Sequence, residues 1–114
     1  MIYFFSFYFH NVLKEFNVTG VLKKNEEELM ERYLNGDSLA FQTIYELYSP
    51  PIFKFLLRKT QQSLARAEDL LQSSFLKLHT KREFYDPKYP VLQWLYVIAR
   101  SVWLDEERKT KSQT

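Results

Sequence analysis

The second half of the chain combines basic and aromatic side chains in a pattern that suits binding to nucleic acid. Cationic side chains attract phosphates and release their counterions. Aromatic rings stack on unpaired bases, and each such contact contributes about 1–3 kcal/mol. Stacking favours single-stranded or melted nucleic acid, because the bases of an intact duplex are not free to stack on a protein. Between Lys77 and Lys111 the basic members are Lys81, Arg82, Lys88, Arg100, Arg108 and Lys109, and the aromatic members are Phe84, Tyr85, Tyr89, Trp94, Tyr96 and Trp103.

Core packing is the alternative explanation for these aromatic residues. A small helical protein must bury aromatic side chains, and the sequence leaves both explanations open for Phe84, Tyr85 and Trp94. The aliphatic residues around them, such as Leu95 and Ile98, are expected to pack inward.

Residue patterns typical of catalysis are missing. His10 and His79 are far apart in sequence, and neither has the spacing of a metal ligand pair. Glu68 and Asp69 are adjacent, so on a helix they point in different directions and cannot share a site. The chain has no cysteine and no glycine-rich phosphate loop. We therefore expect neither an enzyme nor a cofactor or metal.

Composition predicts one folded domain with a modest core. The chain has 114 residues, of which 46% are hydrophobic and 18% aromatic, which excludes a wholly disordered protein. Its net charge of +2 is too small to identify a partner. The aromatic octet Ile2–Phe9 is too short to cross a bilayer, which needs about 20 residues. We expect a cytoplasmic protein without a membrane partner, in which residues 1–24 form an extension. The alternatives for this segment are a short helix or strand that packs on the body of the protein, and a membrane-surface anchor.

The elements that position these residues are expected to be helices. Acidic residues begin a short helix at Glu26–Asn35, and Gly36 should end it. Asp37 or Ser38 should cap a second helix. Pro50-Pro51 should kink or break that helix, with a continuation over 52–62.

Two further helices follow in the sequence. Ser63 is the predicted N-cap of a helix over 64–81. A loop over about 80–90 should lead into a last helix over about 91–109. Spacings of three and four place Leu64, Ala67, Leu71, Phe75 and Leu78 on the inward face of the first of these helices. We predict an all-α fold, a compact bundle of four to five helices in residues 25–111, with a polar tail at 112–114.

Three ordered motifs resemble bacterial RNA polymerase sigma factors of the extracytoplasmic-function type. The motifs are Gly36-Asp37-x-x-Ala40-Phe41-x-x-Ile44-Tyr45-x-x-Tyr48-x-Pro50, then Ala67-Glu68-Asp69-Leu70-Leu71-Gln72-x-x-Phe75-Leu76-x-Leu78, then Tyr85-Asp86-Pro87-x-x-Pro90-Val91-x-x-Trp94-Leu95-Tyr96-x-Ile98-Ala99-Arg100. The resemblance covers residues 33 to about 109 and concerns only the promoter-melting domain, called region two.

This resemblance implies two binding surfaces. The helix over 66–78 would dock on the clamp of the largest subunit of core RNA polymerase. The loop and the last helix would bind the non-template strand of melted promoter DNA at the minus-ten element. The resemblance, together with the polar face of the helix over 66–78, gives the expected polymerase-binding residues, which are Arg66, Asp69, Gln72, Ser73 and Lys77. The resemblance, together with the basic and aromatic pattern described above, gives the expected DNA-binding residues, which are Lys81, Arg82, Tyr85, Lys88, Trp94, Tyr96, Arg100 and Ser101.

The chain also departs from the family pattern. Ser73-Ser74 stands where an acidic residue usually follows the glutamine, and Ser101 stands where asparagine is common. No domain for the minus-thirty-five element is expected in this chain, so a separate promoter-anchoring subunit is one further partner. The alternative functions are a regulator that binds polymerase or an anti-sigma protein without opening promoters, and a structural or membrane-associated helical module.

Overall fold

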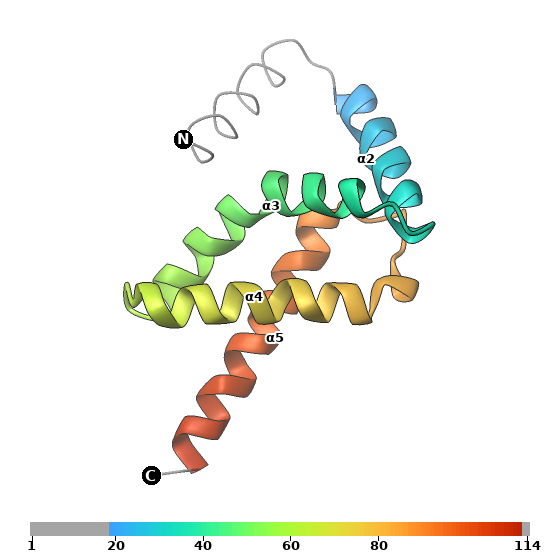
Figure 1. Ribbon diagram of the computed structural model, residues 1–114. Coiled ribbons are helices and arrows are strands. Elements are labelled where there is room, and N and C mark those ends of the chain that lie inside the picture. Colours follow the sequence, from blue (N-terminus) through green and yellow to red (C-terminus); the bar gives the residue numbers. More distant parts are fainter. Residues whose placement is uncertain (1–18, 113–114) are drawn as a thin grey trace. The chain divides into compact units, whose positions relative to one another are not determined.

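The computed structural model describes residues 19–112, and these form helices joined by short connections (Figure 1). The elements in chain order are α2 (Thr19–Leu34), α3 (Ser38–Lys59), α4 (Leu64–Thr80), the short 3-10 helix η1 (Arg82–Phe84) and α5 (Val91–Ser112). The predicted all-α class is confirmed, and the described residues contain no strand. The helix α2 begins at Thr19 instead of Glu26, inside the expected extension, whereas Ile2–Phe9 lies outside the described residues.

The chain divides into two compact units, residues 1–50 and 51–114, with the boundary inside α3. In the first unit, Gly36 ends α2 with a φ of 95°. Its amide donates to the carbonyl of Tyr33 (3.0 Å), and the next amide, of Asp37, donates to the carbonyl of Arg32 (3.0 Å). This pair of bonds satisfies two carbonyls that the helix end leaves without partners. Asp37 then caps α3, because its Oδ1 accepts from the amide of Leu39 (3.0 Å). The expected stop and cap are both confirmed.

The proline pair does not break α3, which continues without interruption from Ser38 to Lys59. Proline lacks an amide donor, but its φ is compatible with a helix. Buried apolar residues recur on both sides of the pair, with Ile44 before it and Ile52 and Leu56 after it. Burial of these side chains stabilises the helical path despite the missing donors.

The second unit contains the end of α3, α4, η1 and α5, and α5 crosses α4 and packs on it (Figure 1). Ser63 caps α4 as predicted, with its Oγ accepting from the amide of Arg66 (3.3 Å). The prediction was wrong for Leu64, whose side chain is 62% exposed. Side chains on a helix point toward its N-terminus. The side chain of a residue in the first turn therefore points beyond the end of the buried face and stays exposed. The buried apolar residues of α4 and α5 are Ala67, Leu70, Leu71, Phe75, Leu78, Val91, Leu95, Ile98 and Ala99.

Candidate nucleic-acid interface

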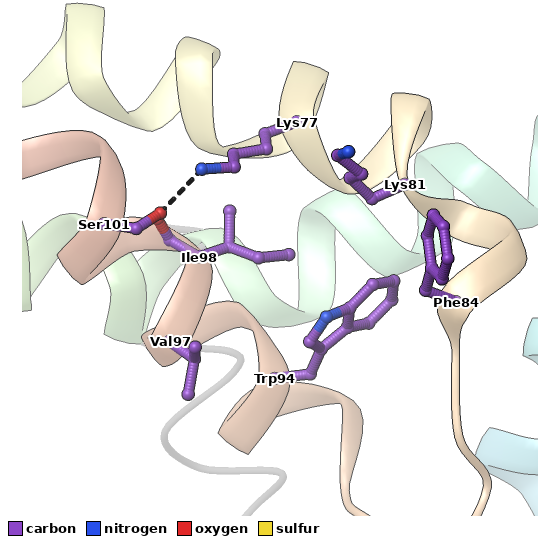
Figure 2. A pocket seen from close by; sticks show the side chains of 7 residues that line it. All are labelled: Lys77, Lys81, Phe84, Trp94, Val97, Ile98 and Ser101. Carbon is purple, nitrogen blue, oxygen red and sulfur yellow. Dashed lines mark hydrogen bonds between the residues drawn. The ribbon is translucent and has the colours of Figure 1, made fainter. Parts of the chain in front are cut away.

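An open groove of about 410 Å³ lies between α4 and α5, and we call it the α4–α5 groove (Figure 2). Two lysines project into it from α4 and its C-cap, η1 supplies one aromatic ring, and α5 supplies the remaining side chains. The lining residues are Lys77, Lys81, Phe84, Trp94, Val97, Ile98 and Ser101. None of them is acidic, so the lysine charges make the groove locally positive.

Helical spacing explains why α5 presents these residues together. Val97 and Ile98 lie three and four positions after Trp94, and Ser101 lies four and three positions after them, which places all four along one side of the helix. The turn η1 places Phe84 at one end of the groove (Figure 2). Its amide donates to the carbonyl of Lys81 (2.9 Å), which continues the chain directly from the end of α4.

Two lysines have defined contacts within the α4–α5 groove. Lys77 Nζ donates to Ser101 Oγ at 2.8 Å. Ser101 Oγ in turn donates to the carbonyl of Ile98 at 2.8 Å. Lys81 Nζ lies 5.6 Å from the ring centre of Phe84, within range of a cation–π interaction. The groove therefore offers cations and exposed ring surface side by side.

The expected DNA-binding residues divide between the groove and its surroundings. Lys81, Trp94 and Ser101 line the groove. Tyr85 is half-buried, with its ring centre 6.0 Å from that of Trp94. The exposed cations beside the groove in sequence are Arg82, Lys88 and Arg100.

A tight turn presents Lys88 in the loop between η1 and α5. The amide of Tyr89 donates to the carbonyl of Asp86 (3.1 Å), and the amide of Lys88 donates to Asp86 Oδ1 (3.0 Å). Aspartate followed by Pro87 is typical of such a turn, because proline fixes the backbone angle of the second position. The ammonium of Lys88 is thus carried on an ordered loop.

Tyr96 lies away from the groove. Its ring packs edge-to-face on Phe55 of α3, with ring centres 5.5 Å apart and an interplanar angle of 81°. Trp103 lies on the same side of α5, where Lys59 Nζ is 4.9 Å from its ring centre. Tyr96 and Trp103 thus both contact α3. The structure does not bring Tyr96 together with Trp94.

The expected polymerase-binding residues also divide into two groups. Asp69, Gln72 and Ser73 are exposed on α4. Arg66 turns toward α5, where it pairs with Glu106 and with Glu107, the latter at 2.9 Å. The hydrogen bonds that Arg66 donates to Glu106, and then the one that it donates to Glu107, raise the pKa of its guanidinium above the usual value. Lys77 also turns toward α5, as described above.

Two features were missed from the sequence. Val97 lines the groove, and Leu76 is 66% exposed on α4 beside Gln72 and Ser73. Phe84, for which the sequence left stacking and packing open, also lines the groove. The signal for Val97 was its spacing of three from Trp94 and four from Ser101. Leu76 could have been found because it is an apolar residue that does not fit the spacing of three and four positions that links the buried residues of α4.

The two serines that replace the family's acidic position have different surroundings. Ser73 is exposed, whereas Ser74 is fully buried and donates to the carbonyl of Leu70 at 2.7 Å. A carboxylate is therefore compatible with position 73 and would be buried at position 74.

Residues 19–112 hold no group of three or more histidine, cysteine or acidic side chains able to hold a metal ion. In the same part of the chain, no helix has the length and apolarity needed to cross a bilayer.

Comparison with known proteins defines the class to which this helical unit belongs. Residues 44–113, more than half of the chain, match Sigma-70 region 2, so the chain belongs to the sigma-70 region 2 family. This match and the relatives described next confirm the resemblance to sigma factors of the extracytoplasmic-function type.

Similar proteins include three bacterial sigma factors. The RNA polymerase sigma factor CarQ of Myxococcus xanthus is 35% identical over 79 residues, which cover 69% of this chain and 45% of the relative. The ECF RNA polymerase sigma factor SigM of Bacillus subtilis is 33% identical over 66% of this chain and 45% of the relative. The ECF RNA polymerase sigma factor SigF of Caulobacter vibrioides is 29% identical over 73% of this chain and 46% of the relative. This chain thus spans less than half the length of these relatives. No solved structure matches it.

Proposed function

We propose that this chain binds core RNA polymerase and the melted minus-ten element of promoter DNA, and thereby stabilises the opened promoter. Membership of the sigma-70 region 2 family supports the general role in transcription initiation. The observation that carries the DNA-binding part is the α4–α5 groove, in which aromatic and cationic side chains meet without a carboxylate.

The chemistry of the groove suits an unpaired strand. Phe84 is 66% exposed and Trp94 is half-buried, so both rings keep surface on which a base can stack. Lys77 and Lys81 provide positive charge across the groove from Trp94 (Figure 2) for the phosphates of the same strand. Binding of an extruded base would offset the few kcal/mol needed to unstack it. Arg82, Lys88 and Arg100 extend this positive surface outside the groove.

The outer face of α4 is the proposed contact with polymerase. Asp69, Gln72 and Ser73 are exposed on it, and Leu76 adds an apolar side chain that is 66% exposed. A polar stripe with one apolar contact suits docking on another helix, such as the clamp coiled coil of the largest subunit. None of these four residues lines the groove, so both partners can bind together.

Binding of a labelled single-stranded oligonucleotide that carries a minus-ten-like sequence tests the DNA-binding role. Fluorescence anisotropy should show tighter binding to the single strand than to the matching duplex. Trp94→Ala should weaken binding about 5- to 150-fold, as expected for the loss of one stacking contact. Gln93→Ala is the matched control, because Gln93 is the exposed neighbour of Trp94 outside the groove. Equal affinity of wild type and Trp94→Ala for the single strand would contradict the proposal.

Co-elution with core polymerase tests the other surface. The combined variant Gln72→Ala and Leu76→Ala should lose co-elution while keeping its affinity for the single strand. Trp94→Ala should show the reverse behaviour. Retained co-elution of the α4 variant would exclude the outer face of α4 as the docking surface.

A further inference from the structure

We infer that Ser101 is a positioning residue that holds the ammonium of Lys77 in the α4–α5 groove, so that Lys77 contacts the DNA strand and not the polymerase. This inference rests on the proposed DNA-binding function and assigns two residues within that site. It also moves Lys77 from the polymerase-binding set, in which the family resemblance had placed it, to the DNA-binding set.

The hydrogen bonds of Ser101 leave it without a proton for a ligand. A serine hydroxyl has one proton and two acceptor lone pairs. The proton of Ser101 is donated to the carbonyl of Ile98 (2.8 Å), and one lone pair accepts from Lys77 Nζ (2.8 Å). Ser101 therefore cannot donate to a base or a phosphate while these bonds persist. Phosphate oxygens need a donor, so we assign the effect of Ser101 on the phosphates of a bound strand to Lys77.

Lys77 keeps unused donors in this arrangement. An ammonium has three protons, and one of them goes to Ser101. The groove offers no carboxylate to neutralise the remaining charge. The two other protons are therefore available to acceptor oxygens of a strand in the groove, and phosphate oxygens are the strongest acceptors that the strand carries.

The charge of the neighbouring Lys81 explains why Lys77 needs the hydrogen bond to Ser101 to stay in the groove. Lys77 and the C-cap residue Lys81 are four positions apart, so they lie on the same side of the chain at the end of α4 and their charges repel each other. Lys81 lies over the ring of Phe84, and Lys77 is held by Ser101 at the other end of the groove (Figure 2). The two contacts fix two cations on one wall, with room for a strand beside them. Without Ser101, Lys77 would turn toward solvent.

The orientation of Lys77 argues against a polymerase contact. Asp69, Gln72 and Ser73 are exposed on the outer face of α4. The ammonium of Lys77 instead reaches α5 and is part of the groove lining. To contact a protein on the outer face, Lys77 would have to break its hydrogen bond to Ser101.

A double-mutant cycle on the full chain tests this inference. The four proteins are the wild type, Lys77→Met, Ser101→Ala and the double variant, and the probe is a labelled single-stranded oligodeoxynucleotide with a minus-ten-like sequence. Lys77→Met should weaken binding and reduce the slope of log K against log salt by about 0.7, the value for one phosphate contact on a single strand. Ser101→Ala should weaken binding about 2- to 10-fold, corresponding to one hydrogen bond. In the Lys77→Met background, Ser101→Ala should have no effect.

Three controls separate positioning from other roles. Ser101→Thr keeps the hydroxyl and should bind like the wild type. Lys54→Met removes an exposed lysine of α3 outside the groove and should change the salt slope less than Lys77→Met. Ser101→Ala should also raise the acetylation rate of Lys77 relative to Lys81, measured by mass spectrometry without DNA. Thermal unfolding of each variant checks that the fold is kept.

A penalty for Ser101→Ala that persists in the Lys77→Met background would overturn the inference and leave the proposed function standing, because Ser101 would then contact DNA itself. Loss of polymerase co-elution in Lys77→Met, with unchanged DNA binding, would also overturn it. Absence of single-strand binding by the wild type would overturn both.

Discussion

Two helices of this protein end in the same hydrogen-bond pattern with different residues at the left-handed position. Gly36 ends α2 with φ 95°, and Gln61 ends α3 with φ 56°. The amide of Gln61 donates to the carbonyl of Arg58 (3.4 Å), and the amide of Gln62 donates to the carbonyl of Leu57 (2.8 Å), as in the motif at Gly36. A side chain with a Cβ is disfavoured at positive φ, whereas glycine is not.

This comparison predicts opposite effects of two glycine substitutions. Gln61→Gly should raise the free energy of unfolding by about 0.5–1 kcal/mol, because relief of backbone strain exceeds the added chain entropy of the unfolded state. Gly36→Ala should lower it by about 1 kcal/mol, and the added Cβ would meet no atom within 4 Å, so the cost isolates the backbone conformation. Urea unfolding measures both. A destabilised Gln61→Gly would mean that the Gln61 side chain itself stabilises the connection.

We expect the carboxylate of Asp37 to make a contribution to the free energy of unfolding that is lost at acid pH. Its hydrogen bond with Arg32 (2.9 Å) lowers the pKa of Asp37 below its ordinary value of 3.8. A carboxyl with a lowered pKa in the folded state stabilises the fold above its unfolded pKa, and this contribution disappears as the pH falls through the folded value. Asp37→Asn keeps a good capping residue but removes the charge. The stability difference between wild type and Asp37→Asn should be constant above about pH 5 and shrink below pH 4. A difference independent of pH in urea titrations would refute this role.

At the scale of the elements, α5 presents different residues to different neighbours. Trp94 and Ser101 face the groove, Tyr96 contacts Phe55 of α3, and Glu106 pairs with Arg66 of α4. The last pair joins the first turn of α4 to the last turns of α5 across 40 positions of sequence. The ion pair therefore restrains a stretch of α5 whose final residues are exposed.

Replacement of Arg66 should increase local opening at the end of α5 and have only a small effect on the stability of the whole fold. Arg66→Gln should lower the free energy of unfolding by about 1 kcal/mol or less, because the side chain of Arg66 is 41% exposed and water screens its pairs. Amide hydrogen exchange over residues 104–112 should become faster, while exchange in the buried part of α5 should not change. Arg58→Gln, at an exposed position of α3, is the matched control. Unchanged exchange over 104–112 would show that the ion pair does not restrain this segment.

The sequence predicted local features well and long-range contacts poorly. The caps at Ser63, Gly36 and Asp37 depend on atoms within a few residues, so the residue type alone identifies them. The contact between Lys77 and Ser101 joins positions 24 apart and depends on how α4 and α5 cross. Spacing along one helix predicts a shared face but not the neighbour that covers it. Tyr96 was grouped with Trp94 by residue type, although positions two apart on a helix point to different sides and Tyr96 contacts α3.

For the whole molecule, the distribution of charge matters more than its sum. The net charge is only +2, so long-range attraction of DNA should be weak. Two cations, Lys77 and Lys81, nevertheless line the groove, and Arg82 and Lys88 follow them closely in sequence. Affinity for a single strand should therefore depend on contacts made at this site and not on the overall field.

This distribution predicts the salt dependence of DNA binding. If three to four cations each contact one phosphate of a single strand, the slope of log K against log salt should be about −2 to −3, at about −0.7 per phosphate. Lys88→Met and Lys81→Met should each make the slope less steep by about one phosphate contact, whereas Lys54→Met should leave it nearly unchanged. Trp94→Ala should lower the affinity at every salt concentration without changing the slope, because stacking releases no counterions. A slope near zero for the wild type, or a slope change in Trp94→Ala equal to that of Lys81→Met, would contradict the division between phosphate contacts by lysines and base stacking by aromatic rings.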